Sequence, residues 1–86
     1  MPIGTGRLMP DGHIGRMAVL RSWRGMGVGS ALLTRLLDVA RALGMYRVAL
    51  NAQIQALPFY LHHGFQPEGE EFLEAGIRHR RMGRDL

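Results

Sequence analysis

The segment Arg24-Gly25-Met26-Gly27-Val28-Gly29-Ser30-Ala31-Leu32-Leu33 places three glycines at alternate positions directly before a long stretch of regularly spaced apolar residues. Glycine has no Cβ atom, so a glycine-rich loop lets the backbone approach another group closely. The first N–H groups of the following helix have no partner inside the helix, and they lie at the positive end of its dipole. These features predict an anion-binding loop. A turn that only shapes strand-to-helix packing is the alternative.

Two common nucleotide-binding loops do not fit this segment. A Walker A loop ends in Gly-Lys followed by Ser or Thr, and the chain contains no lysine. A Rossmann loop requires Gly-x-Gly-x-x-Gly, but counting from Gly27 and Gly29 the third glycine position is Leu32. We therefore expect another phosphate-bearing ligand, because Arg21 and Arg24 add positive charge beside the loop.

The glycine segment connects two predicted strands through one helix. Residues 14–20 end in four consecutive apolar residues, as is typical of a strand at the centre of a sheet. Residues 30–43 repeat apolar side chains at helical spacing, and Gly44 is placed to end this helix. Residues 45–50 predict the next strand. This order predicts a parallel, right-handed crossover.

The remaining elements extend the crossover into a larger sheet. Pro10-Asp11-Gly12 predicts a hairpin turn between strands at 7–9 and 13–20. Residues 55–63 predict a short second helix that ends at Gly64. The rest of the chain predicts a bent or edge strand over 65–72, a loop over 73–77 and a last strand over 78–84. The expected fold class is α/β, with a mixed sheet and the element order β-β-α-β-α-β-β.

Several motifs resemble, in the same order, those of the GNAT superfamily of acyl-CoA N-acyltransferases. Arg24-x-x-Gly27-x-Gly29 is similar to the family's pyrophosphate loop. Asn51 and Phe59-Tyr60-x-x-x-Gly64-Phe65 resemble the end of its next strand and the helix that follows. The series from Gly4-Thr5-Gly6-Arg7-Leu8 to Phe72-Leu73-Glu74-Ala75-Gly76-Ile77-x-His79 is similar to a bacterial branch related to ElaA. The resemblance covers essentially the full chain.

The resemblance implies a site for acetyl-CoA. It implies that backbone N–H groups of residues 24–30 hold the pyrophosphate, and that the main chain of residues 17–20 binds the pantetheine amides. It also implies that the two parallel strands splay apart, with the pantetheine arm entering the gap beside Asn51. The implied cofactor-binding residues are Met17, Ala18, Val19, Arg24, Gly25, Met26, Gly27, Val28, Gly29, Ser30, Asn51 and Phe59.

The resemblance implies a catalytic role for Tyr60. This residue matches the family's tyrosine near the cofactor sulfur, which is a general acid for the departing thiolate. From spacing alone, the alternative is an aromatic side chain that packs beside Phe59 with its hydroxyl group at the surface.

The sequence does not identify a general base. His13 is the first residue of the central strand and the best titratable candidate for the general base. The alternative is a histidine in a turn that faces water. His62 and His63 are adjacent on a helix and cannot share a face, so no metal site is expected there. His79 matches a position in the family branch, but no role is assigned to it.

Composition narrows the classes of partner. The chain has no cysteine, which excludes disulfides, thiolate metal sites and a cysteine nucleophile. No apolar stretch could span a bilayer and no signal peptide is evident, so we expect a cytoplasmic protein without a membrane partner. The net charge of +4 suits a phosphate-bearing ligand. Nucleic acid is less favoured, because the carboxy-terminal arginines have no interleaved aromatic residues.

Complete GNAT domains begin with a further strand and two helices, so we expect residues 1–86 to form a single domain that lacks them. The uncovered edge of the hairpin predicts a homodimer or another assembly. The expected function is transfer of an acetyl group from acetyl-CoA to an amine of a small molecule or a protein. A non-catalytic acyl-CoA-binding or regulatory remnant of such a domain is the alternative.

Overall fold

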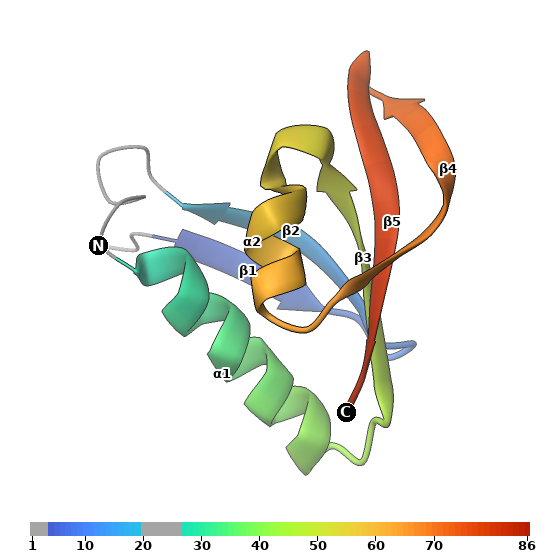
Figure 1. Cartoon of the computed structure of the whole chain (residues 1–86). Helices are drawn as coiled ribbons and strands as arrows, with labels where there is room; N and C mark the ends of the chain where they lie inside the picture. Colours follow the sequence, from blue (N-terminus) through green and yellow to red (C-terminus); the bar gives the residue numbers. More distant parts are fainter. Residues whose placement is uncertain (1–3, 20–26) are drawn as a thin grey trace.

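The computed structural model describes residues 4–19 and 27–86. The predicted element order is confirmed, with one turn of 3-10 helix inserted before the second helix (Figure 1). The elements are β1 (Gly4–Leu8), β2 (His13–Val19), α1 (Val28–Ala42), β3 (Arg47–Gln53), η2 (Ile54–Ala56), α2 (Leu57–His62), β4 (Gln66–Glu74) and β5 (Ile77–Asp85). Among the described residues, no helix has the length and apolar character needed to cross a membrane.

The strands form one mixed sheet in the order β1-β2-β3-β5-β4. β2 lies inside the sheet, antiparallel to β1 and parallel to β3, as its position before the crossover predicted. α1 begins at Val28 rather than at Ser30, because Gly27 adopts a φ of 75° and is the N-cap residue. β3 continues to Gln53, beyond its predicted end, because β5 pairs with it along its whole length.

The β4–β5 hairpin also differs in part from the prediction. β4 is an edge strand, and its register with β5 shifts between Glu68 and Phe72, so the predicted bent edge strand is confirmed. The predicted loop over 73–77 is shorter than expected. Ala75 and Gly76 make the turn, and both have a positive φ.

The turn between β1 and β2 closes against β3. The N–H group of Gly12 donates to the carbonyl of Met9 at 2.9 Å, and the carboxylate of Asp11 accepts from the N–H of His13 at 3.0 Å. The carbonyl of Gly12 in turn accepts from the N–H of Ala49 on β3 at 3.0 Å. The hairpin is therefore attached to β3 through this turn as well as through β2.

α1 is amphipathic, and it covers the sheet with its buried face. Leu33, Leu37 and Ala40 lie at helical spacing and are buried, whereas Thr34, Arg35, Asp38 and Arg41 are exposed. Full burial of one leucine side chain contributes about 1.5–3 kcal/mol, so this face anchors the helix. Gly44 has a φ of 79° directly after the C-cap residue, as predicted for the end of the helix.

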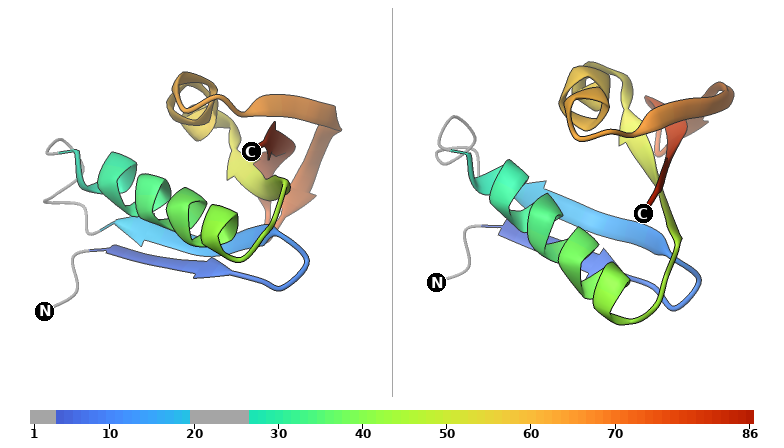
Figure 2. Two further views of the ribbon diagram at one scale, coloured as in Figure 1. Left: turned by 90° about the horizontal axis from the view of Figure 1, so that it is seen from below. Right: turned by 60° about the horizontal axis from the view of Figure 1, so that its bottom comes forward.

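One apolar core joins both helices to the sheet. Figure 2 shows the sheet bending between β2 and β3, with both helices on the inner side of the bend. The buried residues of the core are Ile14, Leu33, Leu37, Ala40, Val48, Leu50, Ala52, Phe65 and Met82. Val48, Leu50 and Ala52 alternate along β3 and therefore share one face of it.

Candidate functional site

The parallel strands β2 and β3 meet at one end and then diverge. Their register pairs are His13 with Ala49 and Ile14 with Leu50. The later residues of the described strands have no register pair with each other, and Figure 1 shows the two arrows separating toward their tips. The divergence leaves main-chain groups of both strands without partners from the other strand. The splay implied by the resemblance is present.

The helix that follows β2 begins at this open end. Gly27 is the N-cap residue, and α1 has neither a side-chain cap nor an acidic residue in its first turn. Apart from its chain neighbours, no atom of the described residues lies within 4 Å of the position that a Cβ atom on Gly27 would take. The first-turn N–H groups therefore lack the side-chain acceptor that most helices supply. Arg24, Gly25 and Met26 of the predicted loop lie outside the described residues.

Four further predicted residues lie along the two diverging strands. The backbone of residues 17–19 is part of β2, and Ala18 and Val19 pair with β1 on the side away from β3. Asn51 is half-buried on β3, directly after the last residue that pairs with β2. The edge of β2 that faces β3 and the backbone of Asn51 therefore lie where the two strands begin to diverge.

Tyr60 lies on α2, which follows the open end of β3. Its ring packs edge-on against Phe59 at 5.0 Å and against Phe65 at 5.8 Å between ring centroids. Burial raises the pKa of Tyr60 above its ordinary value of 10.0. The phenol therefore stays protonated at neutral pH, as a general acid requires.

A hydrogen bond that the sequence did not reveal joins the first turn of α1 to the end of α2. Ser30 Oγ lies 2.9 Å from Nε2 of His63, which is the C-cap residue of α2. Burial, followed by the positive charges of His62 and Arg84, lowers the pKa of His63 below its ordinary value of 6.5. The two residues are 33 positions apart in the chain, so no local pattern could have indicated their contact.

The other histidines lie elsewhere. His13 is half-buried and stands opposite Ala49, at the closed end of the strand pair. His79 is buried in the β4–β5 hairpin, where Nδ1 lies 2.7 Å from the carbonyl of Ile77 and the ring stacks on Phe72. Within residues 4–19 and 27–86, no group of three or more His, Cys, Asp or Glu side chains could hold a metal ion.

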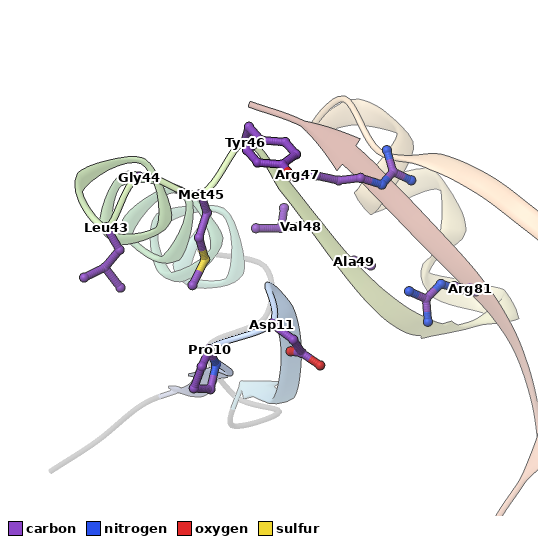
Figure 3. Close-up of a pocket in the computed structure, with 10 residues that line it drawn as sticks. All are labelled: Pro10, Asp11, Leu43, Gly44, Met45, Tyr46, Arg47, Val48, Ala49 and Arg81. Carbon is purple, nitrogen blue, oxygen red and sulfur yellow. The ribbon is translucent and has the colours of Figure 1, made fainter.

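A separate hollow of about 490 Å³ lies at the closed end of the strand pair (Figure 3). It is bordered by the β1–β2 turn, by the connection from α1 to β3 and by the side chains of Arg47 and Arg81. Arg47 pairs with Asp85 at 2.7 Å and also with Glu68, so its charge is already compensated. No predicted site residue lines this hollow.

Comparison with known proteins decides the family. A model of the acetyltransferase (GNAT) domain matches residues 1–86, the whole chain. The chain belongs to the GNAT acetyltransferase family. The chain is similar to the uncharacterized N-acetyltransferase YjcF of Bacillus subtilis, which is 44% identical over 88 residues that cover 98% of this chain and 63% of YjcF.

Solved structures agree with this assignment. ElaA of Escherichia coli is 34% identical with a TM-score of 0.74, over 84% of this chain and 49% of ElaA, which supports the predicted branch of the GNAT family. A GNAT acetyltransferase from Elizabethkingia anophelis with acetyl-CoA bound has a TM-score of 0.81 over 98% of this chain and 69% of that one. Its identity is 20%, so the likeness concerns the fold alone.

The matched segment is shorter than the relatives. The chain spans 63%, 60% and 56% of the length of three curated relatives from Bacillus subtilis, which is less than two thirds of each.

Proposed function

We propose that the chain binds acetyl-CoA at the open end of the β2–β3 pair and transfers the acetyl group to an amine of a small molecule or a protein. The observation that carries this proposal is the divergence of two parallel strands, with a helix between them that starts at a glycine and has no side-chain cap. The structural neighbour from Elizabethkingia anophelis, which has acetyl-CoA bound, adds support from the shared fold.

The chemistry of the exposed groups fits this ligand. Backbone N–H groups of residues 24–30, ending at the uncapped start of α1, suit a diphosphate because they combine hydrogen-bond donors with the positive end of the helix dipole. The free edge of β2 at residues 17–19 suits the amides of a pantetheine arm, which would bind like an added strand. Asn51 and Phe59 are assigned to the same arm.

The chain's own part in the reaction centres on one proton. As an uncharged amine attacks the thioester carbonyl, the new carbon–nitrogen bond forms, the carbon–sulfur bond breaks and the sulfur leaves as a thiolate. Tyr60 donates its phenolic proton to that sulfur, and the amine loses a proton to water. At its ordinary pKa of 10.0 the phenol of Tyr60 already carries this proton at neutral pH, and burial raises the pKa further.

We also propose that another chain covers β1. This strand is at the edge of the sheet and pairs with β2 alone among the described strands, so its outer backbone groups can pair with a second copy. Light scattering at micromolar concentration is expected to show a dimer or a larger assembly, and a monomer would contradict this proposal.

A matched pair of glycine variants tests the cofactor site. Gly27 and Gly44 lie at opposite ends of α1, with φ of 75° and 79°. Within 4 Å, a Cβ on either would meet no part of residues 4–19 and 27–86 beyond its own chain neighbours. Leucine at either position costs the same backbone strain, about 1–2 kcal/mol, so both variants should melt alike. Calorimetry should show that Gly27→Leu abolishes acetyl-CoA binding and that Gly44→Leu retains it. Normal binding by a folded Gly27→Leu variant would refute the site.

Release of free thiol with a panel of amines tests the transfer reaction. The chain has no cysteine, so a thiol reagent reports only the coenzyme that is released. An acetyltransferase should release thiol in proportion to the amine consumed. A protein that only binds acyl-CoA would bind acetyl-CoA but release no thiol.

A further inference from the structure

The Ser30–His63 contact joins the two sides of the opening between β2 and β3. Ser30 lies in the first turn of α1, which follows β2, whereas His63 caps α2, which follows β3. The distance between Ser30 Oγ and His63 Nε2 is 2.9 Å, and the contact is partly buried. A bond across the opening can fix the position of one helix relative to the other.

His63 is held firmly enough to act as such an anchor. Its carbonyl accepts a hydrogen bond from Nη1 of Arg84 on β5 at 2.9 Å, and its ring lies 4.9 Å from that of Phe59 between centroids. The next residue, Gly64, has a φ of 84°, and a Cβ there would lie 3.2 Å from Nε of Arg84. The backbone after α2 is therefore tied to β5, while the imidazole reaches α1.

Tyr60 is close to this anchor along α2. The N–H group of His63 donates to the carbonyl of Tyr60 at 3.1 Å, so the two residues belong to the same last turn of the helix. The contact with Ser30 therefore lies within one helical turn of Tyr60.

We propose that His63 is a positioning residue of the cofactor site, which holds the start of α1 against α2 through the hydroxyl group of Ser30. The proposal rests on the function proposed above, because its effect is on the diphosphate-binding turn. His63 does not contact the reacting atoms. It keeps the N–H groups around Ser30 in place before the ligand arrives, which lowers the cost of ordering them on binding.

Calorimetric titration of acetyl-CoA tests the proposal with five variants. His63→Leu and Ser30→Ala should each weaken binding by about 3- to 10-fold, the range expected for one hydrogen bond. The double variant should be no weaker than either single variant, because His63 acts through Ser30. His63→Gln should restore most of the affinity, since its amide lies as many bonds from the backbone as Nε2 does. His62→Leu is the control on the same helix. Its ring is exposed and packs edge-on against that of His63 at 5.4 Å between centroids, so it should weaken binding less than His63→Leu does.

Steady-state rates separate positioning from general loss of structure. His63→Leu should raise the KM for acetyl-CoA and leave kcat at saturating acetyl-CoA close to the wild-type value. A merely structural role would lower kcat through loss of folded protein. Unchanged affinity in His63→Leu, or losses that multiply in the double variant, would overturn the proposal.

Nitrogen NMR of the histidine rings supplies a readout that needs no ligand. Ser30→Ala should shift the ring-nitrogen signals of His63, which contacts Ser30, and leave those of His13 in place, because His13 lies at the closed end of the strand pair. Unchanged His63 signals would overturn the proposal even if the cofactor site is correct. If the wild type bound no acetyl-CoA, the proposed function would fail instead, while these spectra would still test the link itself.

Discussion

The two edges of β3 differ sharply in how much of their length is paired. Toward β5, every residue from Arg47 to Gln53 has an antiparallel partner, ending with His79 opposite Gln53. Toward β2, Ala49 and Leu50 are the residues that pair in the part of the chain that the structure describes. The first edge holds the sheet together, and the second leaves an opening in a sheet that is otherwise continuous. One strand thus serves both stability and access to a ligand.

At the paired end of β2 and β3, the close packing of the β1–β2 turn on β3 requires a glycine. Gly12 has a φ of 89°, and a Cβ there would lie 2.6 Å from the carbonyl oxygen of Arg47. This close approach lets the β1–β2 turn accept the hydrogen bond from Ala49. The paired part of the β2–β3 edge is therefore short but tightly packed.

The largest expected effect is a loss of stability when the packing of the β1–β2 turn on β3 is disrupted. Gly12→Ala adds a strained φ and a clash with a backbone atom, so the free energy of unfolding should fall by about 2–5 kcal/mol. Gly76→Ala is the control, since its φ is 75° and a Cβ there meets nothing within 4 Å. It should cost only the strain, about 1–2 kcal/mol. Equal losses in urea unfolding would show that the close packing at Gly12 does not matter.

The next largest effect is on the rate of acetyl transfer at the unpaired side of β3, which faces β2. Tyr60→Phe removes the proposed proton donor, so kcat should fall about 100-fold while the affinity for acetyl-CoA is retained. Tyr46→Phe is the matched control, because Tyr46 is 83% exposed and lies on the connection before β3, at the closed end. Its rate should equal that of the wild type. An undiminished rate in Tyr60→Phe would remove Tyr60 from the mechanism.

The sequence predicted the parts of this arrangement that depend on local spacing. The apolar repeat of α1, the turn at Pro10-Asp11-Gly12 and the glycine that ends each helix all act within a few residues, and all are confirmed. The order of the elements then limits the topology, because a strand, a helix and a strand favour a parallel pair. The GNAT resemblance added the divergence of the strands, which spacing alone did not indicate.

Features that depend on distant partners were missed. The predicted strand over 45–50 stops short of Asn51, Ala52 and Gln53, which are held in the sheet by pairing with β5. The contact of His63 with Ser30 joins two separate helices. From the sequence, His63 was identified only as the residue next to His62 on a helix. Sequence periodicity carries no information on such pairs.

A smaller effect on stability is expected from the ion pairs that link β4 to β3 and β5. Glu68 pairs with both Arg47 and Arg81, and all three side chains are at least 36% exposed. Because water screens such pairs, Glu68→Gln should lower the free energy of unfolding by less than about 1 kcal/mol, and added salt should reduce the difference. Glu70→Gln, an equal charge change at an exposed position of β4, is the control. A change in acetyl-CoA affinity in Glu68→Gln would show that the two edges are not independent.

The smallest expected effect is a pH dependence that originates beside the open edge. The pKa of His63 is lowered in the folded chain by burial and by the charges of His62 and Arg84, so the unfolded chain takes up a proton first as the pH falls. The free energy of unfolding should therefore be largest above the ordinary pKa of 6.5 and should decline as the pH falls through the lower pKa of the folded state. His63→Gln should remove this part of the decline when urea unfolding is compared at about pH 7.5 and about pH 5.5. An identical decline in wild type and variant would show that His63 protonates as readily in the folded chain as in the unfolded chain.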